Sequence, residues 1–214
     1  MNWSDVAIGI CTMPGREALF ADVMRQVADF VGADGAVVVH RHPHGGLARE
    51  DFPRMVSMVL DTPRSEWALL LEDDIHMAPR FGRDALSAMS ECGTDAVTLF
   101  SRSSKDLRML DDGRRFRRQG PASLCMIQAV AVRRYALDGF VDWAPSWYEG
   151  HPEHNHAADI LLGAWLSRQR ATLSVHVPSL VQHRAVPSTL PNHRGARQSE
   201  SFRRAFGVVP GEPR

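Results

Sequence analysis

Short apolar runs alternate with longer segments of helical periodicity along most of this chain. The apolar runs have the length and composition of buried strands and cover residues 6–11, 36–40, 67–71, 95–100, 124–132 and 172–177. Segments in which apolar residues recur at helical spacing or that otherwise favour a helix cover residues 16–31, 79–92, 133–140 and 155–169. Strands that alternate with helices predict an α/β, Rossmann-like fold whose mixed, mainly parallel sheet is flanked by helices.

Two segments depart from this alternation. Residues 107–120 predict a β-hairpin insertion that turns at Asp111-Asp112-Gly113, because Asp-Gly supplies the positive φ angles that such turns need. Beyond His183 the chain becomes rich in Pro, Arg, Ser and Asn. We therefore expect a single domain over residues 1–190, followed by a loop or tail, 191–214, that packs on or near the functional site.

Composition narrows the class of protein. The chain has 214 residues, 44% of them hydrophobic and 23% charged, which is typical of one globular domain and argues against disorder. The formal net charge is zero, so the overall balance indicates no polyanionic partner. Three cysteines without metal-ligand spacing, Cys11, Cys92 and Cys125, predict buried free thiols in a reducing compartment. We expect no signal peptide, no membrane span and a cytoplasmic location.

An acidic cluster, Glu72-Asp73-Asp74, follows directly after the apolar run 67–71. Ligands of open α/β sheets bind outside the carboxyl ends of the strands, which is where this cluster is expected. Adjacent carboxylates repel one another, and a hard divalent ion, Mn²⁺ or Mg²⁺, would relieve that repulsion and neutralise a diphosphate. Asp74 would then bind the metal, while Glu72 or Asp73 contacts a ribose or a metal-bound water. A solvated acidic turn that caps the next helix is the alternative.

The string 67–75, WALLLEDDI, resembles the DxD-type motif of GT-A fold glycosyltransferases, with Glu-Asp-Asp in place of Asp-any-Asp. Three further segments fit that family in the same order along the chain. Residues 8–16 resemble its first strand and nucleotide-binding loop, and residues 159–166 resemble the acidic residue that opens the acceptor-side helix. Residues 178–183 resemble the late segment whose histidine completes metal binding. The resemblance covers roughly residues 6–190.

The resemblance implies metal-dependent transfer of a sugar from a nucleotide-diphosphate donor, with a UDP-sugar favoured, to an acceptor hydroxyl. Thr12 and Arg16 would lie in the nucleotide-binding loop, where Arg16 could meet a phosphate. His183 would join Asp74 as a metal ligand, since a neutral imidazole suits Mn²⁺. The alternative, non-catalytic interpretations are that Arg16 is a solvated helix residue and that His183 is a structural histidine.

Asp159 is the candidate general base of an inverting reaction. A carboxylate in that position would take the proton from the acceptor hydroxyl as its oxygen attacks the anomeric carbon. The alternative is simple stabilisation of a helix N-terminus by a negative charge. The acceptor stays open between a saccharide, a lipid carrier, a protein and a modified nucleic-acid base.

Other clusters leave further functions open. The segment 102–118 is strongly basic, so a nucleic-acid acceptor is one hypothesis and a solvated hairpin the other. Four arginines of the tail could close over the diphosphate or extend this basic surface: Arg194, Arg197, Arg203 and Arg204. A histidine-rich segment follows several aromatic residues and predicts an acceptor-side loop, a zinc site or ordinary packing: Trp143, Trp147, Tyr148, His151, His154 and His156. A metal-dependent nuclease or phosphohydrolase, and an inactive sugar- or nucleic-acid-binding module, are the alternative functions.

Overall fold

A seven-stranded mixed sheet forms the centre of the protein. The computed structural model describes residues 1–32, 35–41, 48–63, 65–124, 126–154, 157–184 and 198–207. The strand order is β2-β1-β3-β7-β5-β8-β6. The strands span β1 Val6–Thr12, β2 Ala36–Arg41, β3 Trp67–Glu72, β5 Ala96–Thr98, β6 Phe116–Gln119, β7 Ala129–Arg133 and β8 Leu173–His176. Their pairings give β1, β2, β3, β5 and β8 one direction and β6 and β7 the other, so the predicted α/β fold class is confirmed.

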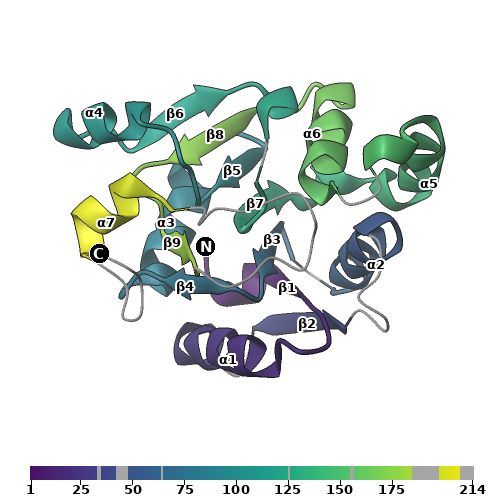
Figure 1. Cartoon of the computed structure of the whole chain (residues 1–214), viewed down its shortest axis with the longest axis horizontal. Helices are drawn as coiled ribbons and strands as arrows, with labels where there is room; N and C mark the ends of the chain where they lie inside the picture. Colours follow the sequence, from purple (N-terminus) through teal and green to yellow (C-terminus); the bar gives the residue numbers. More distant parts are fainter. Residues whose placement is uncertain are drawn as a thin grey trace.

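Helices cover both faces of this sheet (Figure 1). Helices α1 and α3 share one apolar core with β1 and β3, while α2, α5 and α6 share the other. Gly9 in β1 lets α2 lie close, because an added Cβ would meet the Val59 side chain at 2.7 Å. The helices span α1 Glu17–Val31, α2 Ala48–Leu60, α3 Phe81–Glu91, α4 Lys105–Asp111, α5 Phe140–Gly150, α6 Ala158–Arg168 and α7 Glu200–Phe206. None of these described helices is long and apolar enough to cross a bilayer.

A second, two-stranded sheet joins distant parts of the chain. Strand β4 (Ile75–Met77) pairs antiparallel with β9 (Val181–His183), and Ile75 lies opposite His183. The backbone N–H of Arg184 also donates to the carbonyl of Asp74 at 2.8 Å. Because β4 begins immediately after the acidic cluster, this pairing brings the late segment of the chain alongside the end of β3.

The hairpin predicted over residues 107–120 is wrong. Residues Lys105–Asp111 form helix α4, and β6 pairs with β8 instead of with a strand from its own hairpin. Gly113 has a positive φ of 66°, so the Asp-Gly signal marks the residues just after a helix end, a position that also favours glycine. Burial of Met109 shows that the helix uses the apolar residues first assigned to a strand.

Besides α4, three further helices were not predicted from the sequence: α2, α5 and α7. Helix α2 contains Pro53 yet buries Phe52 and Val56 against the sheet. The short helix expected over 133–140 is a 3₁₀ turn, Arg134–Leu137, followed by the full helix α5. Helix α7 lies within the predicted tail, while the proposed domain boundary at 190/191 lies outside the described residues and stays a prediction.

Candidate metal and nucleotide site

The acidic cluster lies where β3 ends, at the edge of the sheet that the prediction required. Glu72 is the last residue of β3, and Asp73 and Asp74 form the bend that leads into β4. Asp73 is only 3% exposed and Asp74 only 4%. Carboxylates this deeply buried lose their hydration and need donors or cations nearby, so their partners define the chemistry of the site.

The end of β1 supplies donors to Asp73. Cys11 lies opposite Glu72 in the parallel register, which sets the β1 loop beside the cluster. Thr12 Oγ1 donates to Asp73 Oδ2 at 2.7 Å, and Arg16 Nη1 donates to Asp73 Oδ1 at 2.8 Å. Burial nevertheless raises the pKa of Asp73 above its ordinary value, because the two donors offset the lost hydration only in part.

Arg16 bridges both buried aspartates. The same Nη1 atom donates to Asp74 Oδ2 at 2.8 Å. Burial lowers the pKa of Arg16, but the charges of Asp74 and Asp73 outweigh it and the pKa is raised. Arg16 is therefore a fixed positive charge within the site, at the position where the sequence predicted a phosphate contact.

His183 completes the contacts of Asp74. His183 Nε2 lies 3.4 Å from Asp74 Oδ2. Burial raises the pKa of Asp74, but His183 and Arg16 together outweigh it and the pKa lies below its ordinary value. Asp74 Oδ1 and His183 Nδ1 are buried, and neither has a hydrogen-bond partner among the residues that the structure describes.

Glu72, Asp74 and His183 form a group that could hold a metal ion. One ligand atom from each lies within 4.8 Å of the others, and no second such group of three occurs in the described part of the chain. Gln128, just before β7, orients Glu72 by donating from Nε2 to Glu72 Oε2 at 2.9 Å. Carboxylates and an imidazole are common ligands of divalent metal ions, and the unpartnered Asp74 Oδ1 is a free ligand atom for such an ion.

The fold brings together six of the seven predicted site residues: Thr12, Arg16, Glu72, Asp73, Asp74 and His183. Asp159 stands in the first turn of α6, where its Oδ1 accepts from the N–H of Ile160 at 2.9 Å. Because α6 returns to the start of β8, which is parallel to β3, its first turn lies toward the edge where these strands end. The role of Asp159 stays a prediction.

Sequence reasoning missed Gln128. It precedes a strand that runs antiparallel to β3, so its side chain reaches the cluster only through the pairing of these two strands. A polar residue at the start of a buried apolar run was the only local signal. The pairing partner of that run could not be read from the chain.

The histidine-rich segment packs against an aromatic residue. The rings of His151 and His154 stack on Trp147, at centroid distances of 4.5 and 5.9 Å. The described residues of this segment form no three-ligand metal group, while Asn155 and His156 lie outside the described residues. Ordinary packing therefore accounts for its described part.

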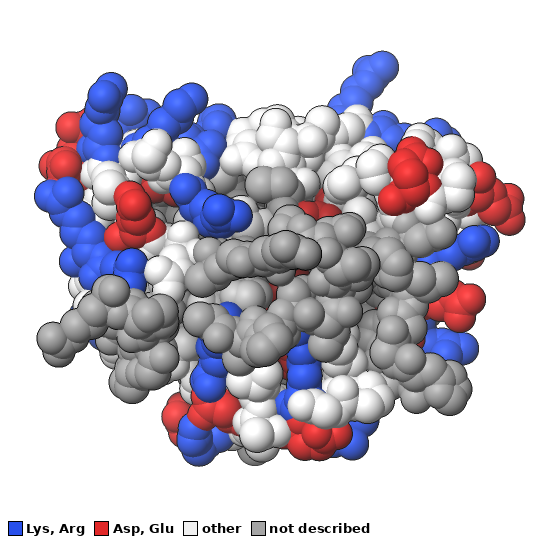
Figure 2. All heavy atoms as spheres, viewed as in Figure 1, with Lys and Arg blue, Asp and Glu red and all other residues white. Residues whose placement is uncertain are grey.

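The basic segment 102–118 is partly neutralised. Arg117 pairs with Asp106 at 3.1 Å, and Arg115 pairs with Glu91 at 2.8 Å. Figure 2 shows acidic side chains interspersed among the Lys and Arg side chains at the α4 end of the molecule. Arg194 and Arg197 of the tail lie outside the described residues, whereas Arg203 and Arg204 lie in α7, where Arg204 pairs with Asp111 at 2.7 Å.

The predicted free thiols are confirmed for Cys11 and Cys92. Burial, with added repulsion from Asp51 and Asp73, raises the pKa of the Cys11 thiol to about 12. Cys11 is therefore a protonated, unreactive thiol at neutral pH. Cys125 lies outside the described residues.

Comparisons with known proteins support the assignment of the fold but do not show a function. No family model and no curated protein sequence matches the chain. Among solved structures, A197 from STIV is similar at 12% identity and a TM-score of 0.50, over 84% of this chain and 86% of that chain. A glycosyltransferase involved in the glycosylation of the major capsid of PBCV-1 is similar at 11% identity and a TM-score of 0.41, over 68% and 69%. The first similarity shows the fold alone, and the second is too low to carry an argument.

Proposed function

We propose that this protein is a metal-dependent glycosyltransferase that moves a sugar from a nucleotide-diphosphate donor, with a UDP-sugar favoured, to an acceptor hydroxyl. The observation that carries the proposal is the convergence of Glu72, Asp74 and His183 beside Thr12 and Arg16. His183 lies far along the chain from Glu72 and Asp74, and the resemblance to GT-A glycosyltransferases assigns all three to the donor and metal site.

The unpartnered polar atoms support the binding of a cation at this group. A purely structural ion-pair network would satisfy Asp74 Oδ1 and His183 Nδ1, because leaving a buried acceptor without a partner costs about 1–3 kcal/mol. An ion bound by Glu72, Asp74 and His183 would supply positive charge for the diphosphate leaving group. Mn²⁺ or Mg²⁺ is the proposed ion.

The residues of the chain itself divide the remaining work. Thr12 and Arg16 lie at the end of β1, where a nucleotide would sit over the carboxyl end of the sheet. Arg16 already holds a buried positive charge against Asp73 and Asp74, and it could shift to a donor phosphate. Asp159, at the start of α6, is the proposed general base for the acceptor hydroxyl.

Turnover of a panel of nucleotide sugars tests this function. We expect hydrolysis or transfer only with Mn²⁺ or Mg²⁺, and at least about a hundredfold slower turnover in Asp74→Asn. Asp112→Asn, an equal loss of charge at an exposed residue after α4, is the matched control and should keep full activity. Normal turnover by Asp74→Asn would overturn the proposal.

The same assay separates the alternatives. Phosphate release or nucleic-acid cleavage that is independent of any sugar nucleotide would identify a phosphohydrolase or nuclease. Ligand binding that is unchanged by a chelator, without product, would identify an inactive binding module.

A further inference from the structure

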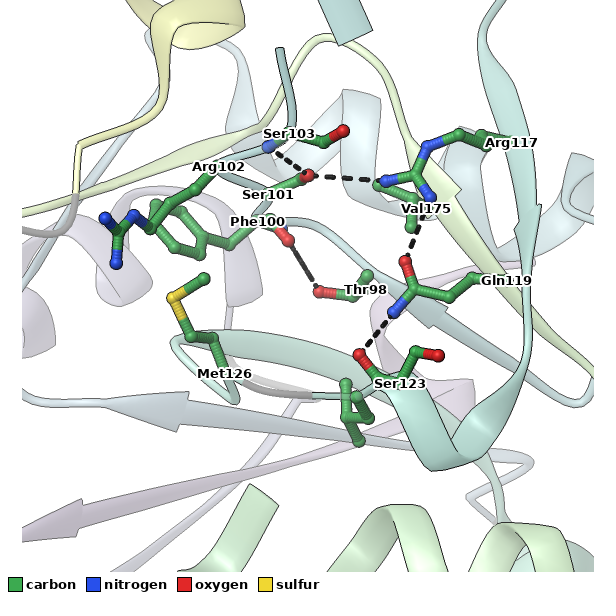
Figure 3. A pocket seen from close by; sticks show the side chains of 11 residues that line it. Thr98, Phe100, Ser101, Arg102, Ser103, Arg117, Gln119, Ser123, Met126 and Val175 are labelled. Carbon is green, nitrogen blue, oxygen red and sulfur yellow. Dashed lines mark hydrogen bonds between the residues drawn. The ribbon is translucent and has the colours of Figure 1, made fainter. Parts of the chain in front are cut away.

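A cavity of about 340 Å³ lies apart from the metal group, over the second half of the sheet (Figure 3). Ligand pockets in proteins typically have volumes of roughly 300–1,000 Å³, so it has room for a small molecule. Arg117 and Gln119 of β6 lie on one side of it, and Arg102 extends beside Phe100 on the side of Met126.

The cavity and Glu72 share one face of the sheet. The register pairs Leu70 of β3 with Val130, Val130 with Thr98, and Thr98 with Val175, so the side chains of all four point to one face. Thr98 and Val175 line the cavity. Glu72 stands two residues beyond Leu70 and therefore points to that face as well.

The two sites are also close along the chain. Met126 lines the cavity, and Gln128, two residues later, donates to Glu72. Two residues span at most about 7 Å of chain. A molecule in the cavity could therefore reach a sugar donor held at the metal group.

The polar wall of the cavity consists mainly of donors that are left over from internal hydrogen bonds. Ser101 Oγ accepts from the N–H of Ser103 and from Arg117, and Gln119 uses one N–H on the carbonyl of Ser123. Among the described residues, the hydroxyl hydrogen of Ser101 and the second amide hydrogen of Gln119 have no acceptor. This wall therefore suits a ligand that is rich in oxygen acceptors.

The charge of the cavity comes from one arginine. Arg117 is neutralised by the buried Asp106, and its Nη1 also donates to Gln119 Oε1 at 3.0 Å. Arg102 is exposed, and it has no ion pair or hydrogen bond to any residue in the described part of the chain. Leu124 and Met126 add apolar side chains to the lining, and Val175 lies beside Arg117, its partner in the β6–β8 pairing.

We infer that this cavity binds the acceptor as an acidic saccharide, with a carboxylate on Arg102, ring hydroxyls on the Ser101 and Gln119 donors, and the apolar face of the ring on Leu124 and Met126. This inference rests on the proposed function and names its acceptor class. A nucleic-acid strand fits less well, because it needs a row of cations along its backbone and the cavity offers one unpaired arginine.

Ligand-observed NMR titration tests the inference with matched pairs of methyl glycosides in the gluco, galacto and manno series, each as the neutral sugar and as the uronate. The titrations are run in EDTA without nucleotide sugar. We expect the uronate of at least one pair to bind about tenfold tighter than its neutral sugar, since a charge-assisted hydrogen bond is lost in the neutral partner.

Variants locate this preference. Arg102→Gln should bind the uronate and the neutral sugar equally, whereas Arg114→Gln, an exposed arginine of the same basic segment outside the cavity, should keep the preference. Equal binding of both sugars by the wild type, or an unchanged preference in Arg102→Gln, would overturn the inference. So would tight binding of a short oligodeoxythymidylate that competes with the uronate.

The measurements distinguish failure of the acidic-acceptor inference from failure of the proposed glycosyltransferase function. Asp74→Asn should bind the uronate like the wild type, because the cavity does not include the metal group. Metal-dependent turnover of a nucleotide sugar without any preference for uronates leaves the glycosyltransferase and removes the acidic acceptor. Uronate binding without turnover of any nucleotide sugar removes the acceptor role, and with it the inference as stated.

Discussion

His183 Nε2 lies 3.4 Å from Asp74 Oδ2, although more than half of the chain separates the two residues in sequence. The contact exists because β9 pairs with β4, the strand that begins directly after Asp74. His183 and Asp74 meet only through the pairing of two short strands, so the site forms only when these distant parts of the chain have folded together.

Replacing the imidazole should weaken metal binding. We expect His183→Gln to bind Mn²⁺ at least about tenfold more weakly in calorimetric titration, because the site loses its nitrogen ligand. His154→Gln, a histidine that stacks on Trp147 away from the group, is the matched control. Equal Mn²⁺ affinities of the two variants and the wild type would rule out His183 as a ligand.

Asp159→Asn separates catalysis from donor binding. Loss of a general base should slow sugar transfer by about 10²–10⁴-fold, while Mn²⁺ and UDP still raise the melting temperature as in the wild type. The expectation follows from the position of Asp159 in the first turn of α6, an element separate from β3 and β9, which carry Glu72 and His183 of the metal group. A variant that transfers sugar at the normal rate would show that another group takes the proton.

Arg16→Gln should destabilise the protein and make metal more stabilising. The change leaves Asp73 and Asp74 buried without their shared cation, and breaking such pairs costs about 3 kcal/mol. Urea unfolding in EDTA measures the loss, and Mn²⁺ should recover more stability in this variant than in the wild type. Arg83→Gln, whose side chain is 63% exposed, should cost less than about 1 kcal/mol. Equal recovery by Mn²⁺ in the wild type and Arg16→Gln would argue against an ion at the cluster.

We predict that His176, which lies outside the metal group, makes the stability of the protein depend on pH. Burial lowers the pKa of His176 to about 4, and the charge of Arg115 adds to this, although the hydrogen bond to the Pro178 carbonyl opposes it. Between pH 6.5 and 4 the unfolded chain therefore binds a proton that the folded chain does not. The stabilisation is complete above pH 6.5 and is lost as pH falls toward 4, by up to roughly 3 kcal/mol.

The variant His176→Asn should remove this slope. Asparagine keeps a donor for the Pro178 carbonyl but does not titrate, so unfolding free energies of the variant should vary less between pH 6.5 and 4.5. The comparison uses the slope and not the absolute stability, because the substitution also changes packing against Phe116. Identical slopes in the two proteins would show that His176 does not titrate in this range.

The sequence by itself determined six strands of the central sheet, β1, β2, β3, β5, β7 and β8, and the acidic end of β3. The run 67–71 is apolar without alternation, which is typical of a strand buried on both faces, and β3 is such a strand. Glu72, Asp73 and Asp74 then had to lie at its carboxyl end. Local patterns sufficed here because consecutive residues indicate both that a strand is buried and where it ends.

Local patterns failed where two types of local structure favour the same residues. The Asp112-Gly113 signal favours a hairpin turn and also the end of a helix, and only the pairing of β6 with β8 decided for helix α4. Helix α2 was not recognised because Pro53 weakens its local signal, whereas packing of Phe52 against the core stabilises it.

Only the tertiary structure decided which side chains meet at the site. The pairing of β4 with β9 set His183 against Asp74, and the pairing of β3 with β7 set Gln128 against Glu72. The donor-lined cavity likewise exists only where β5, β6 and β8 lie side by side. Strand pairing joins residues that are distant in the chain, and a pattern read along the chain records the strands but not their partners.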